Sequence, residues 1–232
     1  MLVTSITAAP RRTGRFDVLV DGLVAATLSL EAIERLQLSV GAIVDERLSA
    51  ALAREASIVA TYDRALNMIA LRARASTELR RLLIRKGEAP EFVDAAIERL
   101  SRAGFLDDAS FAKQFARSKA VGAGLSRRRV QQELVRRGVA RDVAEAAIAE
   151  VFDEEHVDEQ GTLERVARKK MKSLERLDVV VQRRRLYAYL ARRGYDSDDI
   201  SRTLRKVISP ESPPHRLGRE EQERARSPSD TK

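Results

Sequence analysis

Near the N-terminus, apolar and polar residues alternate, which is the period of β-strands. Three short segments have this character, at residues 6–9, 15–20 and 23–28. An Asp-Gly pair separates the last two, and Asp-Gly between apolar runs is a strong signal of a β-hairpin. At Ser29, an expected N-cap, the apolar spacing becomes helical. Residues 1–55 are therefore predicted to form a small strand–helix unit.

Helical periodicity continues to residue 208, and part of it repeats three times. The pattern Leu-x-Arg-(Lys/Arg)-Gly marks each repeat and ends at Gly87, Gly138 and Gly194, which are 51 and 56 residues apart. Apolar residues recur eight positions before and ten and thirteen positions after each glycine. Glycine suits the position after a helix end, where a positive φ is needed. The pattern thus predicts three helix–Gly–helix units.

A further helical segment precedes each glycine-terminated helix. We expect these first helices at about residues 57–73, 108–121 and 155–173, after a short helix at 45–56. Expected N-caps of the glycine-terminated helices are Ser76, Ser126 and Asp178. The predicted three-helix repeats cover residues 56–104, 105–153 and 154–208. The fold class is mainly α: three tandem three-helix repeats after a small N-terminal β-hairpin and helix. Residues 209–232, rich in proline and charge, are predicted to be disordered.

Composition narrows the classes of function. The chain has no cysteine, which excludes a disulfide framework and a Cys-ligated metal. With two histidines among 232 residues, no zinc set and no catalytic constellation can be assembled, so we expect neither an enzyme nor a cofactor. No stretch approaches the roughly 20 apolar residues of a membrane helix, and no signal peptide is recognisable. We therefore expect a cytoplasmic protein without a membrane partner.

Two blocks of sequence resemble the signature of the RecX family of regulatory proteins. Residues 72–79 read Arg-Ala-Arg-Ala-Ser-Thr-Glu-Leu, and residues 104–108 read Gly-Phe-Leu-Asp-Asp, in the order and at the spacing of that family. Residues 15–22, followed by Leu-Ser-Leu-Glu, resemble the additional N-terminal segment of its longer members. The resemblance covers about residues 3–208 and implies tandem three-helix units.

The resemblance also implies a function and partners. RecX proteins bind RecA–DNA filaments, reduce strand exchange, ATP hydrolysis and co-protease activity, and favour filament disassembly. The expected partners are therefore the RecA filament and DNA, contacted directly or through RecA, by a chain that acts as a monomer.

The distribution of charge suggests where such partners bind. The net charge is +8 and the isoelectric point about 10.1, which favours an anionic partner. Residues 161–208 contain 14 Lys/Arg and 6 Asp/Glu, an excess equal to that of the whole chain. On charge and periodicity alone, the candidate binding residues are Arg85, Lys86, Arg136, Arg137, Arg168, Lys169, Lys170, Lys172, Arg183, Arg184, Arg185, Arg192 and Arg193. The alternative is that the paired cations at the helix ends stabilise the helix dipole, by about 0.3–1 kcal/mol each.

The acidic pair that follows the first repeat has two interpretations. Asp107 or Asp108 is expected to cap the next helix, while Phe105 and Leu106 fill the core between helices. The alternative, a metal-binding or catalytic pair, lacks a nearby histidine or third acid.

Two other features also have a structural and a binding interpretation. The glycines at 122 and 124 superficially suggest a phosphate loop, but they lack the preceding strand and the Gly-Lys-Ser/Thr ending, so we expect a turn between helices. Tyr187, Tyr189 and Tyr195 lie among basic residues and could stack on bases, or could belong to the core.

Two other functional classes fit a basic helical-repeat chain. An independent DNA-binding protein of the helix-turn-helix type would need polar base-reading side chains, whereas these helices offer Arg, Ala and Glu. A helical scaffold would make the basic excess incidental.

Overall fold

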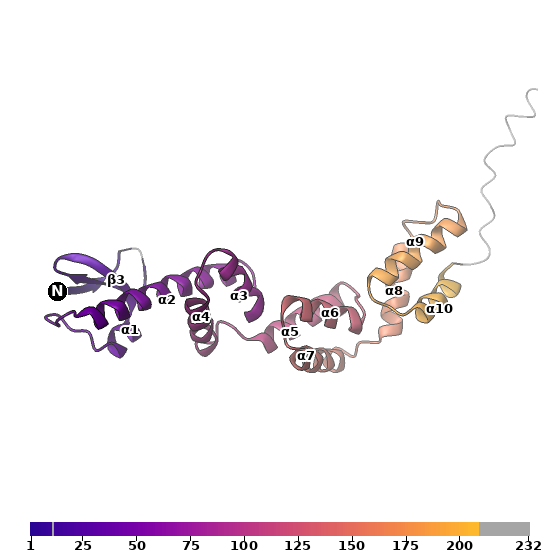
Figure 1. Ribbon diagram of the computed structural model, residues 1–232. Helices are drawn as coiled ribbons and strands as arrows, with labels where there is room; N and C mark the ends of the chain where they lie inside the picture. The colour runs from indigo at the N-terminus through magenta and orange to yellow at the C-terminus, as the bar shows by residue number, and fades with distance from the viewer. Residues whose placement is uncertain (11, 209–232) are drawn as a thin grey trace, which may run out of the picture. The chain divides into compact units, whose positions relative to one another are not determined.

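The structure, a computed structural model, describes residues 1–10 and 12–208; the predicted disordered segment 209–232 lies outside this range. Three β-strands are followed by ten α-helices in the described residues, which confirms the predicted fold class (Figure 1). No helix among these residues is both long and apolar enough to cross a lipid bilayer.

The chain divides into two compact units. The first contains residues 1–117 and 131–151, and the second contains residues 118–130 and those from 152 onward. Helices α6 and α7 each contribute residues to both units.

The N-terminal sheet contains the predicted hairpin, formed by its central strand and one edge strand. Its antiparallel strands are β1 (Val3–Ala8), β2 (Arg15–Val20) and β3 (Leu23–Ser29), in that order. Asp21 and Gly22 have φ angles of 48° and 84°, and two consecutive positive φ values are what a tight hairpin turn requires. Helix α1 (Leu30–Arg35) follows, and the Ser29 hydroxyl accepts a hydrogen bond from the Ala32 amide at 3.3 Å. The predicted N-cap is thus confirmed.

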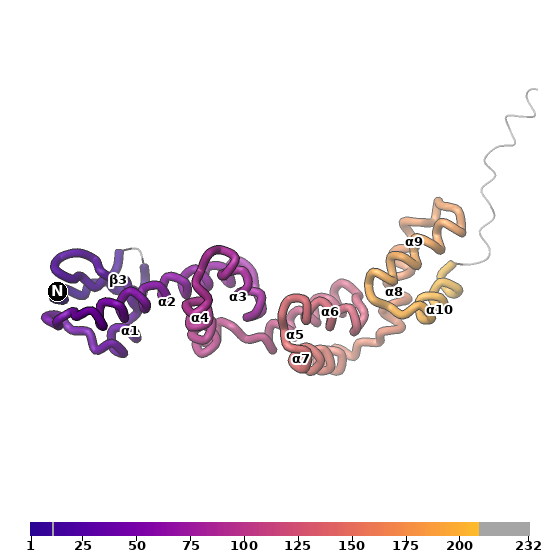
Figure 2. The backbone as a smooth tube through the Cα atoms, in the orientation of Figure 1, coloured from indigo at the N-terminus to yellow at the C-terminus, as the bar shows by residue number. Residues whose placement is uncertain are grey.

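Helix α2 (Glu46–Leu71) is one uninterrupted helix of 26 residues (Figure 2). The two helices predicted at 45–56 and 57–73 are therefore wrong as separate elements, and the boundary predicted after residue 55 falls inside α2. The physical reason is that α2 serves two cores. Leu52 packs in the core of the sheet, while Ala65 packs with Leu79 and Leu83 of the next helix.

The repeats contain the predicted helix–Gly–helix arrangement. Their helices are α3 (Ser76–Arg85), α4 (Pro90–Arg102), α5 (Asp108–Arg117), α6 (Arg127–Arg137), α7 (Arg141–Glu154), α8 (Glu159–Met171), α9 (Val179–Arg192) and α10 (Ser197–Val207), with a π-helical turn, η1 (Ser118–Gly122), after α5. Gly87, Gly138 and Gly194 follow α3, α6 and α9 and have φ angles of 93°, 92° and 88°. Their predicted role at the helix ends is confirmed.

Two of the three predicted N-caps of these helices are confirmed. Ser126 accepts a hydrogen bond from the Arg129 amide at 3.2 Å, and Asp178 accepts one from Val180 at 2.8 Å. The prediction for Ser76 is wrong, because α3 begins at Ser76 itself.

The start of α3 is closed by a carboxylate from another helix. The Ser76 amide and hydroxyl both donate to Asp108 Oδ1, at 2.8 and 3.1 Å. Asp108 is the first residue of α5, so the contact also ties the first repeat to the second.

Consecutive repeats meet at their glycines, and each contact lies within one unit. A Cβ added to Gly138 would lie 2.6 Å from the Cβ of Thr77, and one added to Gly194 would lie 2.5 Å from the Cβ of Arg129. Gly194 is further held because the Arg128 Nε donates to its carbonyl at 3.3 Å. The end of α6 or α9 thus rests on the start of the corresponding helix one repeat earlier.

Candidate functional site

The paired cations at the ends of α3, α6 and α9 differ in how much of each side chain is exposed. The first residues of the pairs are exposed: Arg85, Arg136 and Arg192. Lys86 is exposed as well, whereas Arg137 and Arg193 are half-buried. The pairs are therefore not equivalent in the three repeats.

Arg137 and Arg193 are each held against an aromatic ring. The Arg137 guanidinium lies 4.9 Å from the centroid of Phe115, and its Nη1 is 3.3 Å from Glu78 Oε2. The Arg193 guanidinium lies 4.4 Å from the centroid of Tyr189 and donates to that residue's hydroxyl at 2.6 Å. Such contacts stabilise the fold and reduce the freedom of these two cations to bind a partner.

In repeat three, one face of α8 gathers basic side chains around a cavity of about 540 Å³. We call it the α8 face; it is lined by Gly161, Glu164, Arg165, Arg168, Lys169 and Lys172. The one carboxylate that lines the α8 face, Glu164, is already paired, because Lys206 Nζ donates to its Oε1 at 2.6 Å. This hydrogen bond lowers the pKa of Glu164 below its ordinary value. Lys170 is directed elsewhere, with its Nζ 5.5 Å from the centroid of the Tyr189 ring.

A second basic surface lies along the seam between α9 and α10. We call it the α9–α10 groove; it has a volume of about 480 Å³ and is lined by Val180, Arg183, Arg184, Tyr187, Ser201, Leu204 and Arg205. No carboxylate is among these lining residues. Arg185 is exposed on the same helix but does not line the groove.

The three tyrosines of repeat three have different environments. Tyr195 is buried, which raises the pKa of its hydroxyl to about 12, and it donates to the Gly124 carbonyl at 3.1 Å. Tyr189 is half-buried beneath Arg193 and Lys170. Tyr187 is 40% exposed and lines the α9–α10 groove, so its ring remains accessible to a ligand. As for the predicted turn between helices at residues 122–124, Gly122 ends η1 and Gly124, with a φ of 64°, lies in the connection to α6.

Two basic residues that line these surfaces are absent from the predicted set of cations. Arg165 belongs to the α8 face and Arg205 to the α9–α10 groove. Arg165 could have been found from the helical spacing of Gly161, Arg165, Arg168 and Lys172, which places them on one side of a helix. No repeat signal identifies Arg205, because the equivalent positions eleven residues after Gly87 and Gly138 hold Glu98 and Ala149.

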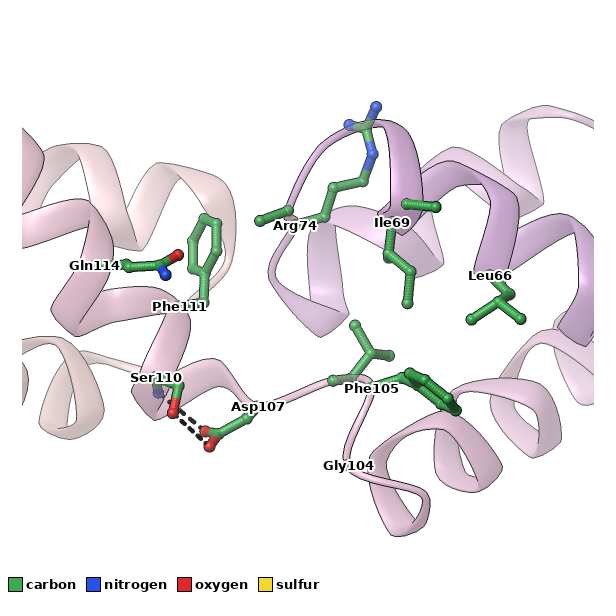
Figure 3. Close-up of a pocket in the computed structure, with 12 residues that line it drawn as sticks. Leu66, Ile69, Arg74, Gly104, Phe105, Asp107, Ser110, Phe111 and Gln114 are labelled. Atoms are coloured by element: carbon green, nitrogen blue, oxygen red, sulfur yellow. Dashed lines mark hydrogen bonds between the residues drawn. The ribbon is translucent and has the colours of Figure 1, made fainter.

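The carboxylates of the acidic pair both serve helix ends. Asp107 Oδ1 accepts hydrogen bonds from the amides of Ala109 and Ser110 at 2.9 and 3.0 Å, which caps α5. Figure 3 shows the contact between Asp107 and Ser110. The pKa of Asp107 lies below its ordinary value, chiefly because the Ser110 amide and hydroxyl both donate hydrogen bonds to its carboxylate. Asp108 closes α3, as described above. In the described residues, no group of three or more acidic or histidine side chains is placed to hold a metal ion.

The neighbouring apolar pair behaves only in part as predicted. Leu106 is buried, whereas Phe105 is 55% exposed, so the prediction that Phe105 fills the core is wrong. Phe105 instead lines an open cavity of about 440 Å³, together with Leu66, Ile69 and Phe111 (Figure 3). The physical reason is local: Gly104, with a φ of 75°, turns the chain at the end of α4, and the core behind it accepts only the second of the two side chains.

Comparison with known proteins identifies three matching domains. Residues 62–100, 107–148 and 158–204 match the first, second and third three-helix domains of RecX, respectively.

Individual relatives carry the same name. The chain is 34% identical to the regulatory protein RecX of Pelodictyon phaeoclathratiforme over 146 residues, which are 63% of this chain and 88% of the relative. It is 39% identical to that of Amycolatopsis mediterranei, over 56% of this chain and 72% of the relative. The match to that of Levilactobacillus brevis is 28% identical and covers 88% of this chain and 76% of the relative.

Two solved structures share the fold. A crystal structure of regulatory protein RecX has a TM-score of 0.68 at 19% identity, covering 86% of this chain and 97% of the other. That of RecX from Lactobacillus salivarius has a TM-score of 0.52 at 16% identity, covering 65% and 96%.

Proposed function

The chain belongs to the RecX family of regulatory proteins, and from this premise we propose that it binds RecA–DNA filaments and inhibits the recombinase. It would act by binding alone, without a reaction of its own, and would thereby modulate DNA recombination and repair in the cytoplasm as a monomer.

The concentration of exposed cations on repeat three supports this proposal best. Arg183, Arg184 and Arg205 surround one groove and have no ion-pair partner among the described residues. The α8 face adds Arg165, Lys169 and Lys172, together with Arg168, whose Nη2 lies 3.8 Å from Glu164 Oε2. Exposed arginines and lysines of this density fit the phosphates of DNA or an acidic surface of the filament. We therefore place the main interface on repeat three rather than equally on all three helix ends.

The effect of such an interface grows with the number of contacts. Each phosphate contact of a surface cation is individually weak, but the contacts made by neighbouring helices of one repeat add. A protein that occupies the filament in this way would compete with the contacts that hold RecA on DNA.

A test of the proposal is the ATPase activity of RecA on single-stranded DNA. Substoichiometric amounts of the protein should reduce the rate, and the variant Arg183→Glu/Arg184→Glu should inhibit at least tenfold less well, because it reverses two charges in the α9–α10 groove. The matched control is Arg85→Glu/Lys86→Glu, which makes the same charge change on exposed residues of repeat one and should inhibit like the unmodified chain. No inhibition at any protein ratio would overturn the proposal.

The alternative is an independent DNA-binding protein of the helix-turn-helix type. Helix α9 exposes Val, Arg and Tyr, while its one glutamine, Gln182, is buried, which favours contact with phosphates over reading of base pairs. Sequence-specific binding to bare duplex DNA, combined with unchanged RecA ATPase activity, would support this alternative.

A further inference from the structure

The α9–α10 groove stands out when the three repeats are compared with one another. In each repeat, the residues seven positions before and seven after the glycine face each other across the seam between the second and third helices. In repeat one, Arg80 Nε donates to Asp94 Oδ1 at 2.6 Å. In repeat two, Gln131 Nε2 donates to Glu145 Oε1 at 2.6 Å. A hydrogen bond to a carboxylate thus bridges the seam in both.

Repeat three has lost this bridge. The two positions hold Tyr187 and Ser201, and both line the groove. Eleven positions after the glycine, repeats one and two carry Glu98 and Ala149, whereas repeat three carries Arg205, so only repeat three has a cation there. The seam that carries an acid in repeats one and two is aromatic and cationic in repeat three.

The position ten residues before the glycine adds to the difference. Arg128 in repeat two donates its Nε to the Gly194 carbonyl of the next repeat at 3.3 Å. Its counterpart in repeat three is Arg184, which is exposed and has no such partner within the described ranges. Arg184 is therefore available to a ligand, whereas Arg128 is engaged by the fold.

These side chains select a particular chemistry. Arginines bind phosphate groups, and an accessible tyrosine ring beside the apolar Val180 and Leu204 offers a stacking surface for a flat base. Bases in a duplex are stacked on each other and do not reach such a ring, whereas bases of a single strand do. An acidic peptide would use the arginines but would leave the ring without a partner.

We propose that the α9–α10 groove binds single-stranded nucleic acid, with one base stacked on Tyr187 and the adjoining phosphates held by Arg183, Arg184 and Arg205. The inference rests on the proposed function in one respect: it names the component of the RecA–DNA filament that this surface would meet.

The first test measures binding of the full chain to a fluorescently labelled oligothymidylate of about 20 nucleotides, long enough for one groove and its flanks. Tyr187→Ala should weaken binding about tenfold, whereas Tyr187→Phe, which keeps the ring, should bind within about twofold of the unmodified chain. A duplex of the same length should bind with an affinity that Tyr187→Ala does not change.

The second test restores the acid that repeats one and two carry. Ser201→Asp places a carboxylate at the position equivalent to Asp94 and should weaken binding about tenfold through repulsion of phosphate. Ser197→Asp adds the same charge to the same helix outside the groove and should have less than a twofold effect. Likewise, Arg184→Ala should weaken binding more than Arg185→Ala, because only Arg184 lines the groove.

Two results would overturn the inference: equal binding by Tyr187→Ala and the unmodified chain, or equal losses in Arg184→Ala and Arg185→Ala. Displacement of the oligothymidylate by polyglutamate, at a carboxylate concentration equal to the phosphate concentration of the oligothymidylate, would also overturn the inference, in favour of an acidic protein ligand. RecA inhibition without Tyr187-dependent binding would refute this inference and leave the proposed function intact. Tyr187-dependent binding without RecA inhibition would support this inference and refute the proposed function.

Discussion

Arginines of repeats two and three differ in how far the fold already engages them, because their surroundings differ. Arg127 lies 4.6 Å from the centroid of Phe152, and Arg137 and Arg193 are similarly placed over rings. A guanidinium held on a ring and hydrogen-bonded to a neighbour is already desolvated and oriented by the fold. Arg183 and Arg184, which have neither kind of partner in the described part of the chain, remain able to bind a phosphate.

At the residue scale, the glycines at the helix ends provide a matched comparison. Gly87→Ala should destabilise the fold by about 1–2 kcal/mol, because only the positive φ is unfavourable and nothing lies within 4 Å of the new Cβ. Gly194→Ala should cost about 2–5 kcal/mol, because the new Cβ would also lie 2.5 Å from Arg129 and 2.6 Å from Ser126. Urea denaturation of both variants measures the difference, and equal losses would contradict the packing of Gly194 against the preceding repeat.

At the scale of elements, helix α2 joins the N-terminal sheet unit to the first repeat. Its Glu55 is buried and receives hydrogen bonds from Arg35, at the end of α1, and from Arg99 of α4, whose Nη2 lies 3.0 Å from Oε2. Burial alone would raise the pKa of this carboxyl, but the hydrogen bonds from Arg99 and Arg35 outweigh burial, so the pKa lies below its ordinary value of 4.5. Three helices therefore depend on one charged carboxylate.

Glu55→Gln should lower the free energy of unfolding at neutral pH by about 3 kcal/mol. This value is at the lower end of the range for removing one partner of a buried ion pair, because the partner Arg35 is partly exposed. Because the folded pKa is depressed, the stabilisation by Glu55 is fully present above pH 4.5 and is lost as the pH falls through the folded value. Urea denaturation at pH 7 and over a series below pH 4.5 measures this. A destabilisation of Glu55→Gln that stays constant with pH would argue against the ion pairs.

On the scale of the whole molecule, the excess of positive charge is concentrated in repeat three. Residues 161–208 hold 14 of the 43 Lys/Arg and 6 of the 35 Asp/Glu, so the rest of the chain carries equal numbers of each sign. The electrostatic attraction to a polyanion should therefore arise from repeat three alone.

Salt dependence of binding to single-stranded DNA tests this distribution. The logarithm of the binding constant should fall with the logarithm of the salt concentration by about 0.7 for each phosphate contacted. Lys169→Ala/Lys172→Ala, on the α8 face, should reduce this slope by about 1.4. Arg85→Ala/Lys86→Ala, which removes the same charge from repeat one, should leave it unchanged; a loss of slope in that variant would place the contacts elsewhere.

Turns, helix caps and helix ends depend on residues close together in the chain, and these features could be predicted from the sequence. The hairpin at Asp21, the cap at Ser29 and the helix ends at Gly138 and Gly194 follow from backbone preferences of single residues, and the helices follow from apolar spacing. The interruption of α2 near residue 56 was predicted wrongly, because continuity of that helix depends on two cores separated in the sequence.

Only the tertiary structure determines which basic and aromatic side chains are available to bind a partner. In the sequence, Arg184 and Arg193 are both arginines of one basic helical region, and Tyr187 and Tyr195 are equally surrounded by cations. The fold places Arg193 on a ring and Tyr195 in the core, yet leaves Arg184 and Tyr187 beside Arg205 from another helix. Periodicity thus determines the helices and their ends, because these are local properties. Which cations can reach a partner depends on contacts between residues far apart in the chain, and only the packing of α8, α9 and α10 sets those contacts.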